Sequence, residues 1–365
     1  MRARAAVLRA KDGPYVIEDV RLAAPGTGEL LVRISGAGIC HTDLLPRVPD
    51  YPAMPPIVAG HEGSGVVEEI GPSVTGLEPG DHVVLTFDSC RACENCYAGH
   101  PAYCDTFLVR NLTGVGLGDS APMQDADGKQ ISARWFGQSS FASHSIVAAR
   151  NVVKVDSSLP LEILGPLGCG MQTGAASVLI ALGVTAGTSI AVYGTGAVGL
   201  SAVMAARVAG AAKIIAVDVS PKRLELAAEL GATHTIDGST DDVVRQIRGI
   251  TGSGTQFALD STGVPAVIVN AITALRQTGT CGLLGVVKGD LILPASVLAL
   301  GRNVKGILEG DAVPQVFLPK LIDLWQQGRF PFDRLVETFP LERINEAEQA
   351  ALAGEVVKPV LLPNG

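Results

Sequence analysis

Residues 189–219 read SIAVYGTGAVGLSAVMAARVAGAAKIIAVDV, and this stretch decides the fold. The apolar run Ser189–Tyr193 predicts a strand, the glycine-rich turn Gly194–Gly199 follows it, and a helix of small residues leads to a second strand that carries Asp218. Such a strand–turn–helix–strand unit, with glycines at the first, third and sixth turn positions, is typical of dinucleotide-binding domains. The alternative is an ordinary glycine turn in an α/β domain, and the acid at the end of the second strand argues against it.

Each glycine of the turn has a distinct physical role in this interpretation. Gly194 allows the tight turn, Gly196 lets the backbone approach a pyrophosphate at the helix N-terminus, and Gly199 lets helix and strand pack closely. Asp218 is placed to accept a hydrogen bond from an adenosine ribose hydroxyl and to repel a ribose phosphate. The sequence therefore predicts NAD rather than NADP, although Arg223, five residues later, weakens that preference.

Length and charge exclude several function classes. The chain has 365 residues, enough for two domains with their own cores, and its net charge of −8 without a basic cluster argues against nucleic-acid binding. The segment 163–206 contains no charged residue and no histidine, but its nine glycines and one proline favour a buried α/β core over a membrane span. The N-terminal residues MRARAAVLRAKDG do not resemble a secretory signal, so we expect a cytoplasmic protein without a membrane partner.

The two halves of the chain differ in pattern. The first half alternates short apolar runs with many glycines, prolines and turn signals, which predicts an antiparallel, barrel-like β domain. It includes a strand-like segment at Phe136–Ala149. After Asp218, strand-like and helix-like segments alternate, which predicts a doubly wound parallel sheet with Val304–Glu309 as its last or edge strand.

Four of the seven cysteines form a compact pattern, C-x2-C-x2-C-x7-C, at Cys90, Cys93, Cys96 and Cys104. Four thiolates so close in sequence can converge on one tetrahedral zinc that clips a loop with little apolar core of its own. The alternatives are an iron–sulfur site or uncoordinated thiols. The ferredoxin run has a shorter last gap and a following proline, and both are absent here.

Three further residues, Cys40, His61 and Cys169, are scattered, and their spacing alone does not bring them together. Taken singly, each reads as a buried thiol or a hydrogen-bonded histidine. Together with the cofactor unit and the cysteine lobe, however, the motifs GICHTD, GHEGSGVV and GCGMQTG resemble those of the zinc-containing medium-chain alcohol dehydrogenases over nearly the whole chain. Within that family, LTFDSC, FGQSSFA, LGPLGCG, GLSAVMAA and GRFPFD are most similar to the aryl (benzyl) alcohol dehydrogenases.

The resemblance implies an α/β fold of two domains. A GroES-like, β-rich catalytic domain would occupy residues 1–170, and a Rossmann domain with a doubly wound parallel sheet would occupy residues 171–308. Residues 309–365 would return to the catalytic domain.

The resemblance also implies a catalytic zinc held by Cys40, His61 and Cys169, with an open fourth position for water or the substrate oxygen. Asp43 would orient the ligand histidine, and Glu62 would approach the metal during ligand exchange; the alternative for Glu62 is a structural acid.

Thr42 would hydrogen-bond the substrate oxygen and pass its proton outward. Many relatives end this relay with a histidine three residues later, where this chain has Leu45, so the end of the proton path is left open. Either the cofactor ribose hands the proton to water, or another base serves.

Further positions follow from the same motifs. For the cofactor, the resemblance implies contacts from His41, Thr173, Gly194, Gly196, Ala197, Val198, Gly199, Asp218, Arg223, Leu284, Val286 and Lys358. Lys358 reads equally well as a solvated surface lysine. For the substrate, it implies an apolar pocket that includes Leu45, Phe87 and Leu284.

The expected activity is reversible hydride transfer from a primary benzyl-type alcohol to NAD, with one catalytic and one structural zinc. The alternatives are the same mechanism on allylic, terpenoid or aliphatic alcohols, a glutathione-adduct dehydrogenase, and a non-catalytic nucleotide-binding protein. The partners expected are a small-molecule alcohol or aldehyde and a second copy of the chain in a homodimer, with a homotetramer as the alternative. Residues 297–309 are the segment expected to continue the sheet across the dimer axis.

Overall fold

The fold divides the chain into two compact units, each formed by discontinuous segments. The computed structural model describes residues 1–117, 122–240, 242–287 and 289–365. The first unit comprises Met1–Gly170, Val313–Lys320 and Asp333–Gly365. The second unit comprises Met171–Ala312 and Leu321–Phe332.

The end of the chain departs from the expected domain boundaries. Residues 309–365 do not all return to the first unit, because 309–312 and 321–332 belong to the second. The boundary at residue 320 falls inside helix α10, Pro314–Gln326. An amphipathic sequence pattern predicts that this segment is a helix but does not say which core each of its turns joins.

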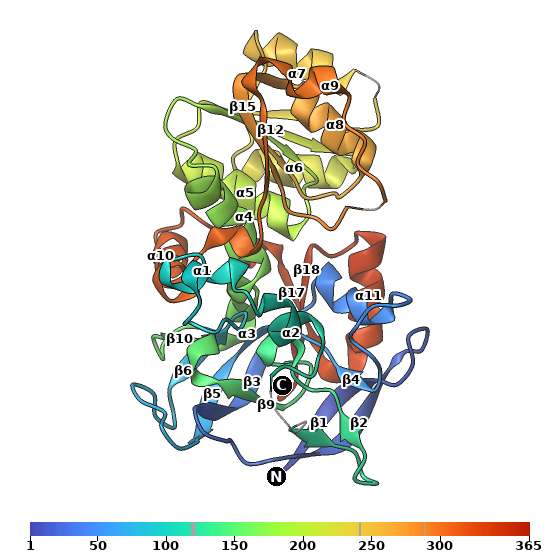
Figure 1. The fold of residues 1–365 in the computed structure, drawn as a ribbon, viewed down its shortest axis with the longest axis vertical. Coiled ribbons are helices and arrows are strands. Elements are labelled where there is room, and N and C mark those ends of the chain that lie inside the picture. The colour runs from blue at the N-terminus through green and yellow to red at the C-terminus, as the bar shows by residue number, and fades with distance from the viewer. Residues whose placement is uncertain (118–121, 241, 288) are drawn as a thin grey trace. The chain divides into compact units, whose positions relative to one another are not determined.

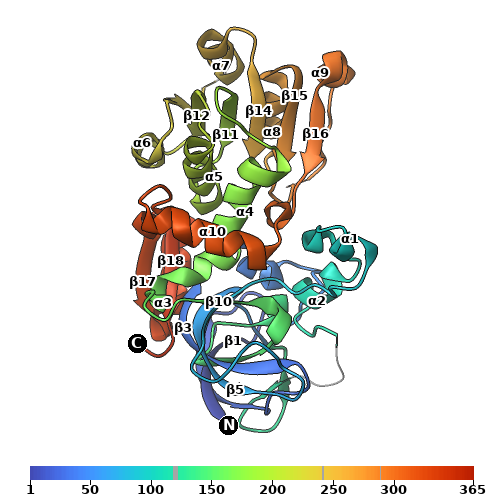
Figure 2. The ribbon, with the colours of Figure 1, turned by 90° about the vertical axis from the view of Figure 1, so that its left-hand side faces the viewer.

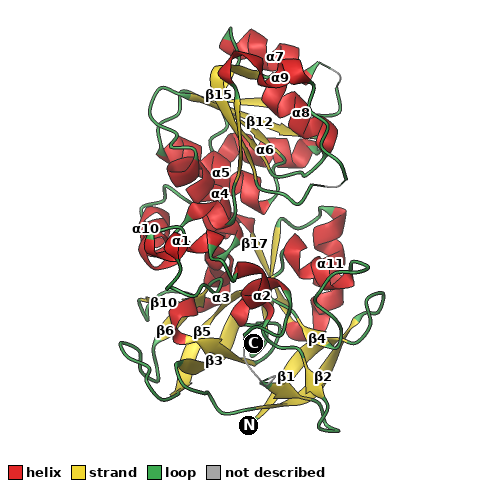
Figure 3. Ribbon diagram, viewed as in Figure 1, coloured by secondary structure: helices red, strands yellow, loops and turns green. Residues whose placement is uncertain are grey.

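The first unit consists mainly of strands and loops (Figure 3). Its five-stranded sheet has the order β4-β1-β2-β7-β8, and its seven-stranded sheet has the order β10-β6-β5-β3-β18-β17, with β9 paired to β3. The strands of the first sheet are β1 Arg2–Leu8, β2 Tyr15–Leu22, β4 Ile57–Val58, β7 Met123–Gln124 and β8 Gln130–Ile131. Those of the second are β3 Glu29–Gly38, β5 Glu62–Ile70, β6 His82–Leu85, β9 His144–Ala148, β10 Val152–Val155, β17 Val336–Pro340 and β18 Lys358–Leu362.

The strands of the first unit pair antiparallel except for β17 and β18, which pair parallel. This confirms the antiparallel β domain expected from the turn density. The short helices of this unit are α1 Glu94–Tyr97, α2 Phe107–Leu112 and α3 Leu161–Leu164, and its long C-terminal helix is α11 Ile344–Ala353.

The second unit is a six-stranded parallel sheet of order β13-β12-β11-β14-β15-β16. Figure 2 shows β12, β11, β14, β15 and β16 side by side with helices around them. The strands are β11 Ser189–Tyr193, β12 Lys213–Asp218, β13 His234–Asp237, β14 Thr255–Asp260, β15 Leu275–Leu283 and β16 Asn303–Gly306. The helices are α4 Gly170–Ala176, α5 Ala197–Val208, α6 Pro221–Leu230, α7 Val243–Thr251, α8 Pro265–Thr273 and α9 Ala295–Leu298.

Counted within the second unit, the strand order is 3-2-1-4-5-6, the doubly wound arrangement of dinucleotide-binding domains. The switch point lies between β11 and β14, which begin the two halves of the sheet. The glycine turn after β11 therefore lies at the carboxyl end of the strand where such folds bind their ligand. The predicted Rossmann sheet is confirmed.

One strand prediction is wrong in part. The segment Phe136–Ala149 was expected to be extended, but only β9 is a strand there. Trp135–Gly137 instead form a 3-10 turn, in which Phe136 has a φ of 50°. Buried hydrogen bonds hold this turn, because Ser139 Oγ accepts from the Trp135 amide at 2.9 Å and donates to Val58 O at 2.7 Å.

Within the described ranges, no single helix is both long and apolar enough to cross a membrane. The bent pair Leu161–Gly168 and Gly170–Ala181 meets that test jointly, by length and composition only. Most side chains of this pair are buried in the protein.

Candidate functional site

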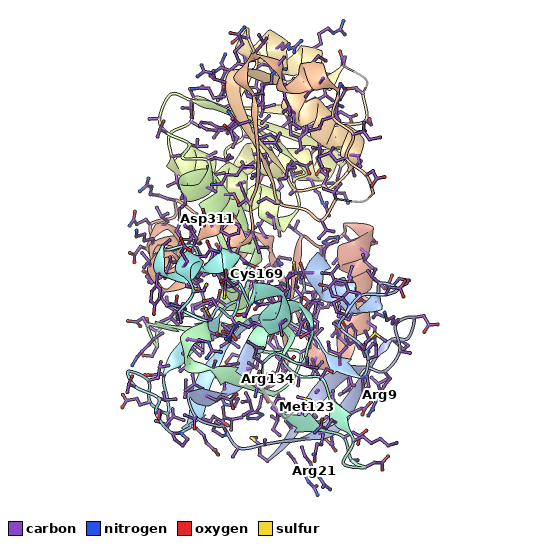
Figure 4. The ribbon with its side chains drawn as sticks, viewed as in Figure 1. Arg9, Arg21, Met123, Arg134, Cys169 and Asp311 are labelled. Atoms are coloured by element: carbon purple, nitrogen blue, oxygen red, sulfur yellow. The ribbon has the colours of Figure 1, made fainter. Side chains whose placement is uncertain are left out.

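The register of two paired strands brings together Cys40 and His61, two of the three scattered candidate ligands. In the pairing of β3 with β5, Gly38 lies opposite Glu62, so Cys40, just after β3, comes close to His61, just before β5. Cys169 follows the 3-10 turn Gly165–Gly168 and is labelled in Figure 4. The ligand atoms of Cys40, His61, Glu62 and Cys169 all lie within 4.8 Å of one another.

A zinc ion fits this cluster. His61 is 1 % exposed, and its Nε2 is buried without a hydrogen-bond partner among the described residues. Leaving a buried polar atom unpaired costs about 1–3 kcal/mol, and a metal ion at Nε2 removes that cost. Two thiols and one imidazole also form the donor set that zinc accepts in catalytic sites with an open fourth position.

The groups of this cluster shift one another's pKa values. A hydrogen bond with Cys169 outweighs burial and holds the pKa of the Cys40 thiol well below its ordinary value. Burial opposes the charged form of His61, but the Asp43 carboxylate and the Cys40 thiol together raise its pKa well above the ordinary range. Metal binding at this cluster requires deprotonated thiols and a neutral imidazole, so it is coupled to proton release.

Asp43 holds the ligand histidine in place, as the resemblance implied. His61 Nδ1 lies 2.7 Å from Asp43 Oδ1, and that oxygen also accepts from the Gly60 amide and the Trp135 indole, each at 3.0 Å. The second oxygen, Oδ2, accepts from the Cys40 amide at 3.0 Å. With Nδ1 engaged in this way, Nε2 is the nitrogen left to face a metal.

Glu62 is held by a partner that the sequence did not assign to it. Lys358 Nζ donates to Glu62 Oε1 at 3.0 Å, to Oε2 at 2.8 Å and to the Ile39 carbonyl at 3.1 Å. Glu62 Oε1 also accepts from the Gly170 amide at 3.0 Å. A Cβ at Gly38 would collide with Glu62 Oε2, so glycine is required beside this carboxylate.

The predicted role of Lys358 as a pyrophosphate ligand is wrong in this structure, and so is the surface alternative. Its three N–H donors are used within the first unit, and the side chain is 2 % exposed. Burial favours the neutral amine, but the Glu62 carboxylate more than offsets this and raises the pKa of Lys358 above its ordinary value. Burial raises the pKa of Glu62 in spite of Lys358.

The four-cysteine lobe forms a second compact thiol cluster. The sulfur atoms of Cys90, Cys93, Cys96 and Cys104 lie within 4.8 Å of one another. Cys90 Sγ accepts from the amides of Ala92 at 3.3 Å and Cys93 at 3.2 Å, as zinc-bound thiolates do. The four thiols cannot all ionise without a cation, since burial and the neighbouring thiols raise the pKa of Cys96 to about 12. The residues fit a structural zinc.

The second unit contains the predicted dinucleotide turn. Gly194 has a φ of 84°, the left-handed region that favours glycine, and a Cβ at Gly199 would collide with the Gly194 carbonyl. A Cβ at Gly196 would meet no described atom within 4 Å, so the backbone is open there. Gly196 caps α5, whose first amides, including those of Ala197 and Val198, have no partners within the helix and can face a pyrophosphate.

Asp218 fixes the turn as well as ending β12. Asp218 Oδ2 accepts from the Thr195 amide at 2.6 Å and the Thr195 hydroxyl at 2.8 Å, and Oδ1 accepts from the Ser220 amide at 2.9 Å. A carboxylate has about four acceptor positions, so capacity for a ribose hydroxyl is left. Arg223 follows on α6, and its Nε is buried without a partner in the described part of the chain.

The remaining predicted residues lie as follows. In the first unit, His41 is exposed, Leu45 is half-buried, Phe87 is buried, and Thr42 Oγ1 lies 3.9 Å from Cys40 Sγ. In the second unit, Thr173 on α4 contacts Glu309 at 3.3 Å, and Leu284 and Val286 follow β15.

The comparisons with known proteins agree with this geometry. Residues 26–157 match the alcohol dehydrogenase GroES-like domain, and residues 197–326 match the zinc-binding dehydrogenase domain. The chain is 45 % identical over 364 residues to the geraniol dehydrogenase of Castellaniella defragrans, an alignment that covers 99 % of this chain and 97 % of that protein. The chain belongs to the zinc-binding medium-chain alcohol dehydrogenase family. Zinc and a nicotinamide dinucleotide, the cofactors predicted from the sequence, are those of this family.

Two solved structures resemble this alcohol dehydrogenase along its length. An alcohol dehydrogenase zinc-binding domain protein from Burkholderia ambifaria has a TM-score of 0.97 at 49 % identity and covers 99 % of both chains. The benzyl alcohol dehydrogenase of Acinetobacter calcoaceticus has a TM-score of 0.93 at 42 % identity and the same coverage.

Sequence reasoning missed several residues around the catalytic cluster of this dehydrogenase. Phe136 stacks on His61, with ring centroids 4.4 Å apart, and Gln138 Nε2 donates to the His61 carbonyl at 2.8 Å. Both lie in FGQSSFA, which carried the resemblance without a role for its residues. The adjoining Trp135 offered the clearest signal, since a buried indole N–H needs an acceptor.

Proposed function

We propose that this alcohol dehydrogenase catalyses the reversible, NAD-dependent oxidation of primary alcohols whose hydroxyl carbon is attached to an aromatic ring. The observation that carries the proposal is a series of buried aromatic rings that begins at the metal ligand His61. Phe136 stacks on His61, Phe107 meets Phe136 edge-on at 6.3 Å, and Phe87 lies 5.8 Å from Phe107.

An aromatic substrate suits such surroundings in two ways. Offset and edge-on aromatic pairs add about 0.5–1.5 kcal/mol beyond the burial of their area. The aldehyde formed from a benzylic alcohol is conjugated with its ring, which favours oxidation relative to a simple alkanol.

The side chains of the first unit would bind and orient the reacting group. When bound, zinc acidifies the alcohol hydroxyl as a Lewis acid and NAD accepts the hydride. Cys40, His61 and Cys169 would hold the metal, while Lys358 keeps the Glu62 carboxylate engaged and thus leaves the fourth position open to substrate.

Proton transfer would begin at Thr42. Its hydroxyl lies 3.9 Å from Cys40 Sγ and can accept the alcohol proton and pass it on. Leu45 cannot continue such a relay, and His41 is exposed, so we propose that water takes the proton beyond Thr42.

The second unit would select NAD. The Asp218 carboxylate is fixed by Thr195 and Ser220, so it cannot turn away from a ribose phosphate without breaking three hydrogen bonds. Its negative charge repels a 2′-phosphate, and we propose that this repulsion outweighs the attraction of Arg223.

The test is NADH formation by the zinc-replete protein with benzyl alcohol, cinnamyl alcohol, geraniol and ethanol, repeated with NADP. We expect the highest kcat/KM with benzyl alcohol and NAD. The matched control is Cys40→Ser, which should lose turnover and one zinc per chain but keep the zinc of the four-cysteine lobe. A protein that holds two zinc ions and oxidises none of the alcohols would refute the proposal.

A second candidate is the oxidation of allylic terpenoid alcohols, favoured by the 45 % identity to a geraniol dehydrogenase. Geraniol also has its hydroxyl carbon next to a double bond, so the same chemistry applies. A higher kcat/KM for geraniol than for benzyl alcohol would establish this candidate and overturn the aromatic one.

We also propose that the enzyme is a cytoplasmic homodimer. None of the seven cysteines, each in a described range, forms a disulfide, which suits a reducing compartment. Strand β16 is an edge of its sheet, and Leu298 and Leu300 before it are 43 % and 64 % exposed. Light scattering would distinguish the dimer from a tetramer or a monomer.

A further inference from the structure

Trp135 is a buried side chain whose single polar atom is aimed at the catalytic cluster. It is 0 % exposed, and its indole Nε1–H donates to Asp43 Oδ1 at 3.0 Å. An indole has one donor and no acceptor, so this bond uses its whole hydrogen-bonding capacity. Phenylalanine would fill most of the same space, and tryptophan's distinctive contribution here is the N–H.

The acceptor of this bond is the oxygen that orients the ligand histidine. Asp43 is 1 % exposed, and its Oδ1 receives the indole, the Gly60 amide and His61 Nδ1 at 2.7 Å. Because this carboxylate is almost fully buried, its position is set by the donors around it. The indole is the only side-chain donor on Oδ1 in the described residues apart from His61 itself.

Trp135 also contacts the ring that covers His61. The Trp135 ring meets Phe136 edge-on at 5.5 Å and 68°, and Phe136 stacks on His61 at 4.4 Å and 27°. One tryptophan thus supports both restraints on the imidazole: the carboxylate at its Nδ1 edge and the phenyl ring on its face.

We propose that Trp135 is a positioning residue for the metal ligand His61. Its N–H fixes Asp43 Oδ1, and this oxygen keeps His61 oriented so that Nε2 faces the metal. Through this chain of contacts, Trp135 sets the affinity of the site for the catalytic zinc. The inference rests on the proposed function, which places a zinc ion at Cys40, His61 and Cys169.

The test removes the N–H and retains the ring. The chain has two tryptophans, and the other, Trp325, packs on Phe332 in the second unit. In a Trp325→Phe background, tryptophan can be replaced at position 135 by benzothienylalanine, which has the same shape with sulfur in place of N–H. Trp135→Phe is the second variant, and Trp325→Phe alone is the matched control.

Zinc release to a chelator is the main readout, and the four-cysteine zinc serves as an internal standard. Mutating a group that hydrogen-bonds a metal ligand, as Asp43 does, typically changes metal affinity by about 10- to 100-fold. Trp135 acts through Asp43, so we expect both Trp135 variants to release one zinc per chain about tenfold faster than the control, the lower end of that range, with the second zinc unchanged. With cobalt at the catalytic site, we expect the visible absorption of the ion to change as its imidazole ligand shifts.

Three outcomes would overturn the inference. Release rates within about twofold of the control, together with an unchanged cobalt spectrum, would show that the N–H does not act on the metal. Equal acceleration of both zinc ions would show a general loss of stability instead. A single zinc per chain in the unmodified protein would overturn the proposed function and this inference together, whereas two zinc ions with unaffected variants would overturn this inference alone.

Discussion

Replacing Lys358 by methionine is expected to destabilise the protein more than any lysine substitution at the surface. Lys358 and Glu62 are 2 % and 0 % exposed, so water cannot solvate the carboxylate that the change leaves behind. Of the hydrogen bonds now made to Glu62, the one from the Gly170 amide is retained. Methionine fills the space of the lysine stem, so the effect isolates the lost charge.

The magnitude follows from the desolvation of the remaining charge. Removing one partner of a buried ion pair costs about 3–5 kcal/mol, whereas replacing both partners with uncharged groups of similar volume is often neutral. We therefore expect Lys358→Met to lower the free energy of unfolding by about 3–5 kcal/mol. The double variant Glu62→Gln, Lys358→Met should recover most of that loss.

The assay is urea unfolding at saturating zinc, followed by far-UV circular dichroism, with Lys222→Met as the matched control because Lys222 is exposed. The control should stay within about 0.5 kcal/mol of the parent. The reasoning would be refuted if Lys358→Met cost less than about 1 kcal/mol. It would equally fail if the double variant were less stable than Lys358→Met alone, because the uncompensated carboxylate would then not be the cause.

Two further predictions concern the glycine turn and the pH dependence of stability. Gly199→Ala should abolish NAD binding and lower the free energy of unfolding by about 1–3 kcal/mol, because the new Cβ collides with the Gly194 carbonyl. Gly196→Ala is the matched control and should fold with the parent's stability, because a Cβ there meets no described atom. Burial lowers the pKa of His144 despite the Glu68 carboxylate at 3.1 Å, so the unfolded chain binds this proton more readily than the folded protein. The free energy of unfolding should therefore fall as the pH drops through about 6.5. His144→Gln should make that loss smaller in urea unfolding measured from about pH 7.5 to 5.5.

Each of these has an outcome that contradicts it. Normal NAD affinity in Gly199→Ala, measured by calorimetry, would mean that helix and strand can separate without cost to the site. A loss of stability with falling pH that is the same in His144→Gln as in the parent would mean that this imidazole is not responsible.

The sequence predicted local features well because their causes are local. The positive φ at Gly194 and the close approach at Gly199 follow from a turn of six residues, and the lobe closes because its four cysteines span a short loop. The parallel sheet could be predicted because each of its strands and helices is recognisable from its own segment of sequence, and the segments alternate along the chain. In the turn and in the lobe, the residues that determine the structure are neighbours in sequence.

The parts that were not predicted depend on contacts between distant residues. Lys358 and Glu62 are 296 residues apart, and Trp135 and Asp43 are 92 apart. Which residues meet across the first unit is fixed by strand register, which no single segment encodes. Cys40, His61 and Cys169 were therefore joined by resemblance and not by their spacing, and the role of Lys358 was assigned wrongly.

The order of strands in the first unit has a consequence for its synthesis. Strand β18, red in Figure 1, pairs with β3. Lys358 Nζ donates to the Ile39 carbonyl, 319 residues away in the sequence. On the ribosome, Cys40, His61 and Cys169 all emerge long before β18 exists. A nascent chain can thus gather its metal ligands while Glu62 still lacks its cation. Strand β18, which is translated much later, joins β17 to β3 and supplies the lysine that pairs with the carboxylate beside them.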